Sequence, residues 1–94
     1  MRQAVIRKTL EGDWTEFAFE KEGRFFFVKN FSDEDILVSF ENGTDEEKCF
    51  KIKSGIGEEL AVSFYPLDKE DFKTNKIFVK GTGEVEVQSL DIHA

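Results

Sequence analysis

Two alternating apolar runs on either side of an Asn-Gly pair constrain the fold of this chain more than any other feature. In Asp35–Glu41 and in Lys48–Lys53 apolar residues occupy every second position, so each run places them on one face of an extended strand. Asn42-Gly43 between the runs favours the positive φ values of a type I′ turn. The stretch therefore predicts a β-hairpin with one apolar side. Its expected inward-facing residues are Ile36, Val38, Phe40, Phe50 and Ile52.

Similar short apolar runs fill the rest of the chain and are separated by residues typical of turns. The further strands are expected at Gln3–Lys8, Trp14–Glu20, Phe25–Val28, Glu59–Tyr65, Lys76–Lys80 and Glu84–Gln88. Leu10–Asp13 and Gly81–Gly83 are interpreted as turns between neighbouring strands. Lys21–Gly23 is short enough to close a hairpin between the second and third runs.

No stretch is periodic enough for a helix of more than one turn, which we place at Leu67–Phe72. Strands at spacings of about 8–12 residues are typical of small sandwiches and barrels. The sequence therefore predicts an all-β chain in which residues 1–94 form one domain. We expect a single small β-sandwich, jelly-roll-like or barrel-like, with about seven or eight short antiparallel strands.

Composition narrows the classes of partner. The 94 residues include 11 phenylalanines, which offer a small core a large apolar area with no polar atom to satisfy. The formal net charge of −7 repels phosphate backbones and anionic lipid surfaces, so neither nucleic acid nor a membrane is expected as a partner. The absence of a long apolar run and of a signal-peptide pattern favours the cytoplasm as the site of synthesis.

The inventory of reactive side chains argues against catalysis. Cys49 is the only cysteine and His93, near the C-terminus, the only histidine, so neither a catalytic triad nor a zinc site is expected. The acidic loops Ser32–Asp35 and Asp45–Glu47 do not match the ligand spacing of an EF-hand. Carboxylate pairs are plentiful, but a domain of this size is small for a glycosidase cleft. We therefore predict no enzyme activity and no catalytic, cofactor-binding or metal-binding residues.

Residues that break the inward-facing pattern are the candidates for contacts with other molecules. Trp14 lies beside a turn, where a flat aromatic ring could stack on a sugar or seal one end of the core. The candidate interaction residues are Val5, Trp14, Phe26, Leu37 and Ile56.

Two phrases, FFFVKNFSDEDILVSF and NKIFVKGTGEVEVQSL, resemble small proteins encoded in the structural gene modules of tailed phages and prophages of Gram-positive bacteria. The matching positions are Val28–Asn30, Asp33, Asp35, Val38–Phe40 and Ile77–Gln88. The resemblance implies a small β-sandwich with a structural or virion-assembly role, of the head-decoration or head/tail-associated type. The implied partners are a second copy of the chain, as a homo-oligomer, or a phage capsid or tail protein. The implied location is the cytoplasm of the bacterial host or the virion itself.

Two other functions stay open from the sequence. A carbohydrate- or surface-binding module would use Trp14, and it predicts that this ring is available to a ligand. An acidic inhibitor that mimics nucleic acid would exploit the net charge, and it predicts one contiguous acidic face.

Overall fold

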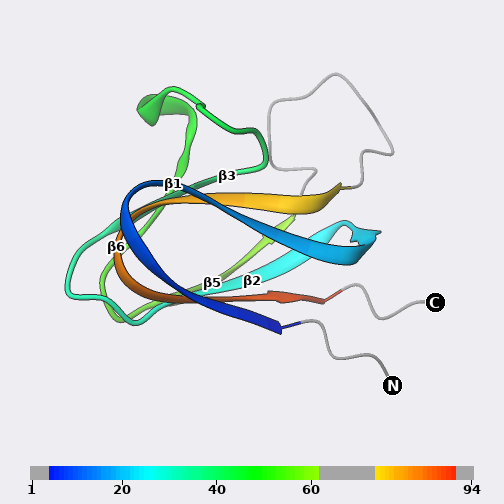
Figure 1. Cartoon of the computed structure of the whole chain (residues 1–94), viewed down its shortest axis with the longest axis horizontal. Coiled ribbons are helices and arrows are strands. Elements are labelled where there is room, and N and C mark those ends of the chain that lie inside the picture. The colour runs from blue at the N-terminus through cyan, green and yellow to red at the C-terminus, as the bar shows by residue number, and fades with distance from the viewer. Residues whose placement is uncertain (1–4, 62–73, 91–94) are drawn as a thin grey trace.

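The computed structural model describes residues 5–61 and 74–90, and in that part of the chain β-strands are joined without an α-helix (Figure 1). The strands are β1 (Val5–Gly23), β2 (Phe25–Asn30), β3 (Ile36–Ser39), β4 (Phe50–Ile52), β5 (Gly57–Ala61) and β6 (Thr74–Ser89). One 3-10 turn, η1, spans Glu46–Lys48. The predicted all-β class is confirmed in a barrel-like form. The predicted helical turn at Leu67–Phe72 lies outside the described residues.

The two longest strands, β1 with 19 residues and β6 with 16, run side by side and organise the sheet. Both bend at the same place: the register shifts between Glu11 and Trp14 of β1, and Gly83 of β6 has a φ of +95°. The turns predicted at Leu10–Asp13 and Gly81–Gly83 are therefore wrong. Glycine marks a bend within a strand as readily as a turn between strands.

The bends fold one sheet into two layers. The first layer contains β5, β2, the second half of β6 and the first half of β1. The second layer contains β4, β3, the first half of β6 and the second half of β1. Figure 1 shows the layers facing one another, with both bends at one side of a nearly closed barrel.

The hairpin predicted between Trp14–Glu20 and Phe25–Val28 does not form. Trp14–Ala18 pairs with β6 in the second layer, whereas β2 pairs with β5 and β6 in the first. The short connection Lys21–Gly23 predicts pairing between the two neighbouring runs. In the structure β1 pairs instead with β6, which is a longer antiparallel partner. The chain passes between the layers at buried Gly23 and exposed Arg24.

The predicted β3–β4 hairpin is confirmed, because Ile36 pairs with Ile52 in an antiparallel register. Its turn differs from the prediction. No residue other than glycine has a positive φ in the described part of the chain, so Asn42 does not take the type I′ conformation. The connection is a longer loop, in which the hydroxyls of Ser39 and Thr44 lie 2.6 Å apart.

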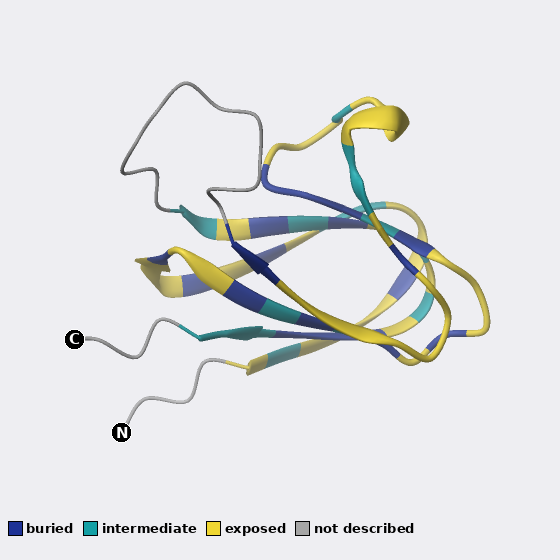
Figure 2. Cartoon of the chain, turned by 180° about the vertical axis from the view of Figure 1, so that it is seen from behind, coloured by how far each residue is buried: buried dark blue, intermediate teal, exposed yellow. Residues whose placement is uncertain are grey.

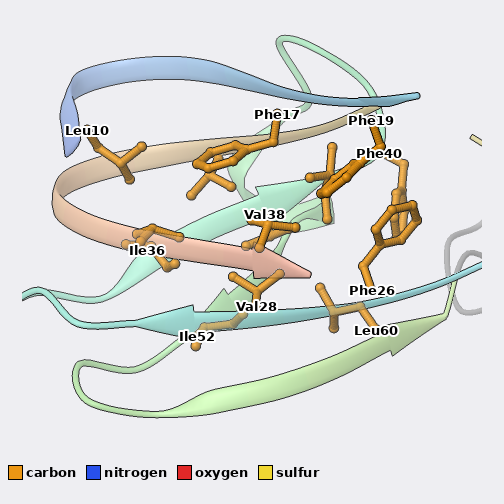
Figure 3. Close-up of a cluster of buried hydrophobic side chains, with 14 residues drawn as sticks. Leu10, Phe17, Phe19, Phe26, Val28, Ile36, Val38, Phe40, Ile52 and Leu60 are labelled. Atoms are coloured by element: carbon orange, nitrogen blue, oxygen red, sulfur yellow. The ribbon is translucent and has the colours of Figure 1, made fainter. Parts of the chain in front are cut away.

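The core lies between the layers, and the strands alternate between buried and exposed residues (Figures 2 and 3). Its phenylalanine rings form a chain, with centroids 5.7 Å apart for Phe19 and Phe26 and 5.8 Å apart for Phe26 and Phe40. Phe26 is fully buried, so its prediction as an interaction residue is wrong. The core residues are Leu10, Phe17, Phe19, Phe26, Val28, Ile36, Val38, Phe40, Ile52, Leu60, Ile77, Val79, Val85 and Val87.

Candidate interaction site

The outer side of the first layer carries every exposed large apolar side chain of the described residues. These side chains are Val5, Phe25, Phe31 and Ile56, whose exposed fractions are 39%, 43%, 53% and 45%. Burial of Ile6, Phe26 and Val28 turns their neighbours on β1 and β2 outward. We call this surface the apolar face. It consists of Val5, Arg7, Thr9, Phe25, Phe27, Lys29, Phe31, Ile56, Glu59, Glu84, Glu86 and Gln88.

A cluster of charges occupies the centre of the apolar face. Neighbouring strands place Arg7 opposite Glu86 and Glu86 opposite Lys29. The Arg7 guanidinium donates two hydrogen bonds to Oε1 of Glu86, at 2.6 and 3.2 Å. Gln88 donates to Oε2 at 2.7 Å, and Nζ of Lys29 lies 3.6 Å from the same oxygen. The carboxylate of Glu86 is therefore paired on both sides although its side chain is only 6% exposed.

These contacts shift two pKa values. The hydrogen bond from Arg7, followed by the one from Gln88, lowers the pKa of Glu86, and these effects outweigh the desolvation that opposes them. The same hydrogen bond raises the pKa of Arg7. Both shifts favour the charged forms of Glu86 and Arg7 at neutral pH. Glu84 lies 3.6 Å from Arg7, so the cluster contains two cationic and two acidic side chains and forms a neutral centre within the apolar rim.

A shallow hollow of about 230 Å³ opens at the end of the face near the β4–β5 connection. Its walls are the side chains of Phe27, Phe31 and Ile56, with Lys29 beside them. The floor includes Gly57, where an added Cβ would lie 2.6 Å from the Phe27 ring. The absence of a side chain at this position lets the ring approach the backbone of β5. The hollow is an apolar recess with one ammonium group at its edge.

Behind the hollow, buried Asn30 holds the acidic turn that follows β2. Its amide donates to the carbonyls of Glu34 and Ile52, and its Oδ1 accepts from the N–H and hydroxyl of Ser32. Asp35 accepts the backbone N–H of Ser54. The Ser32–Asp35 loop is therefore part of the scaffold that supports the hollow. No group of three or more His, Cys, Asp or Glu side chains in residues 5–61 and 74–90 is arranged to hold a metal ion.

The structure divides the predicted interaction residues among three places. Val5 and Ile56 lie on the apolar face, and Phe26 lies in the core. Trp14 and Leu37 lie on the second layer, each opposite Lys80 in the register. The ammonium of Lys80 lies 6.0 Å from the centre of the Trp14 ring, which is half-buried. This ring is therefore not a bare aromatic platform.

Sequence reasoning missed the two most exposed phenylalanines of the face. Phe25 begins a run of three phenylalanines followed by Val28, which has no alternation to mark its outward members. Phe31 follows β2 and was not assigned to a strand. Asn30 is the residue that could have identified them. Its side chain is buried, so the residues at odd positions in this stretch, Phe25 and Phe31 among them, face outward.

Cys49 is half-buried beside the 3-10 turn, with its Sγ 3.4 Å from the carbonyl oxygen of Asp45. Burial, followed by the nearby carboxylate of Glu46, raises the pKa of this thiol. A raised pKa lowers the thiolate fraction at neutral pH, and the thiolate is the nucleophilic form. The surroundings of Cys49 thus oppose nucleophilic chemistry.

Neither a protein-family model, nor a curated protein, nor a solved structure matches this chain. Residues 5–61 and 74–90 contain no helix that is long enough and apolar enough to span a lipid bilayer.

Proposed function

We propose that this chain is a non-enzymatic structural or assembly protein of a phage or prophage that acts through protein–protein contacts. The observation that carries the proposal is the position of Val5, Phe25, Phe31 and Ile56 on one face. Single exposed apolar residues are common on any surface, but a group of them on one face is typical of an interaction site. The virion role is proposed from the resemblance of two sequence phrases to phage structural proteins. The apolar face is the proposed docking surface for that role.

The carbohydrate-binding alternative receives less support. Stacking on a sugar needs an open aromatic face, whereas Lys80 lies over the ring of Trp14. The nucleic-acid mimic needs one contiguous acidic surface. The described acidic residues instead lie in separate elements, such as the Ser32–Asp35 turn, the loop at η1 and β5. The protein-docking role fits both observations.

Mass spectrometry of purified particles tests the proposal. Particles are prepared from a host strain in which the gene for this chain is replaced by the wild-type, Phe31→Asp or Ala18→Asp form. Ala18 is exposed on the second layer, so its change adds the same carboxylate away from the apolar face. We expect the wild-type and Ala18→Asp chains in particles and about tenfold less of Phe31→Asp, since a charge in an apolar contact loses affinity.

Absence of the wild-type chain from particles and from their assembly intermediates would refute the virion role. Equal incorporation of all three chains would show that the apolar face is not the docking surface. Circular dichroism of each purified chain serves as the control for folding.

A further inference from the structure

The apolar face is nearly neutral although the chain is strongly acidic. Its charged members are Arg7 and Lys29 against Glu59, Glu84 and Glu86, a net charge of −1, whereas the whole chain carries a net charge of −7. Most of the excess negative charge of the described residues therefore lies on other surfaces. A partner attracted by charge would be basic and would approach those surfaces, not this one.

We infer that the partner of the apolar face is the same face of a second copy of this chain, in a two-fold dimer. The inference rests on the proposed function and names the partner of that site. Two acidic chains repel one another least where each presents a nearly neutral surface, and contact there also removes exposed apolar area from water. The face therefore combines the attraction and the low repulsion that self-association requires.

A two-fold interface needs a surface that is complementary to itself. The face contains both signs of charge in exposed positions: the side chains of Arg7 and Glu84 are 58% and 50% exposed, and they lie 3.6 Å apart. In a two-fold dimer, each of them can meet the opposite group of the other copy. The apolar rim supplies Phe25, Phe31 and Ile56 for contact on both sides.

Pairing through strand edges is the main alternative geometry, and charge disfavours it at β5. This strand ends the sheet order of the described residues, and its sequence is GEELA. Antiparallel pairing of its five residues with their own copy would place Glu59 opposite Glu59. Like charges directly opposite one another destabilise a strand pair, and charged edges are a common protection against such pairing. The face is therefore a better route to a dimer than the β5 edge.

Light scattering after size-exclusion chromatography tests the inference on the full chain. The wild type is measured at a chain concentration of about 100 µM, which exceeds the micromolar Kd of weak interfaces of standard size. Its mass should then be twice the chain mass of 10.9 kDa. Ile56→Asp should weaken self-association about tenfold or more, because it places a charge in the apolar rim. The control Ala18→Asp should dimerise like the wild type.

A second measurement needs no substitution. In amide NMR spectra of the wild type over a dilution series, the concentration-dependent shifts should fall on β1, β2, β6 and the 55–57 turn. A monomer at every concentration, or shifts confined to the second layer, would overturn the inference. A wild-type monomer that still enters particles in a Phe31-dependent manner overturns the dimer alone. A dimer that never enters particles overturns the virion role alone.

Discussion

Replacing Gly83 by alanine tests the bend on which both layers depend. Gly83 lies where β6 passes from one layer to the other, with a φ of +95°. A Cβ at this position would lie 2.3 Å from Cβ and 3.2 Å from Cα of Ser32. Ser32 cannot withdraw freely, since its hydroxyl donates to Oδ1 of Asn30 at 2.7 Å. The added methyl group therefore meets the best-anchored part of the turn after β2.

Two separate costs contribute to the loss of stability in Gly83→Ala. An L-residue forced to positive φ loses about 1–2 kcal/mol. Overpacking against a neighbour that cannot relax costs a further 1–3 kcal/mol, roughly. Gly12 supplies the matched control, because its φ is +101° and an added Cβ would meet nothing within 4 Å. Gly12→Ala should therefore show the first cost without the second.

Urea unfolding of the wild type and both variants, followed by circular dichroism, measures the difference. We expect Gly83→Ala to lose about 1–3 kcal/mol more than Gly12→Ala, with similar m-values. For a domain of this size each kcal/mol corresponds to a fall of about 4–8 °C in Tm. Equal losses in the two variants would refute the contact between the β6 bend and Ser32, and with it this arrangement of the layers.

Two further changes test the core and the charged centre of the face. Phe26→Ala should lose about 3–5 kcal/mol of unfolding free energy and Phe25→Ala less than about 1 kcal/mol, because only Phe26 is buried. Similar losses for the two variants in urea titrations would contradict the burial of Phe26 and the exposure of Phe25. The hydrogen bond from Arg7 lowers the pKa of Glu86, so its stabilising contribution is present above the unfolded-state pKa of about 4.3 and is lost as the pH falls through the folded-state pKa. The stability advantage of the wild type over Glu86→Gln should therefore be largest near neutral pH and shrink in acid. If the wild type were more stable than Glu86→Gln by the same amount in acid and at neutral pH, Glu86 would not be ionised in the cluster.

Local alternation in the sequence was sufficient to predict the class of fold and much of the core. Ile36, Val38 and Phe40 are buried as their spacing predicts, and Val85 and Val87 are buried likewise. Apart from Leu37, each of these runs has polar residues in its alternate positions, so its parity is clear. Where that contrast is missing, prediction fails.

The run from Phe25 to Val28 is the clearest failure. All four residues are apolar, and periodicity cannot separate Phe25, which is exposed, from Phe26, which is buried. The glycine bends are a second case, since Gly81–Gly83 has the composition of a turn between strands. Long-range pairing decides both cases. Pairing with β6 determines which residues of β2 face outward, and pairing with β1 keeps β6 continuous through its glycines.

The charged centre of the face has no local signature at all. Arg7 and Glu86 are separated by 79 positions in the chain, and only the pairing of β1 with β6 brings them together. Neither residue differs in the sequence from many other charged residues at outward-facing positions. A site built from the two ends and the middle of a chain becomes visible only once the strand order is known.

The same contacts that compensate the charges of the face also fix its strands in register. Arg7, Glu86 and Lys29 come from three adjacent strands, and a slip of one residue between two of them would turn a charged side chain into the core. Charge compensation and strand order therefore depend on the same side chains, so a substitution at Arg7 would alter folding and docking together. Phe31 and Ile56 lie at the rim, exposed and outside the ion cluster. Changes at these two positions can weaken docking while the register of the first layer is kept.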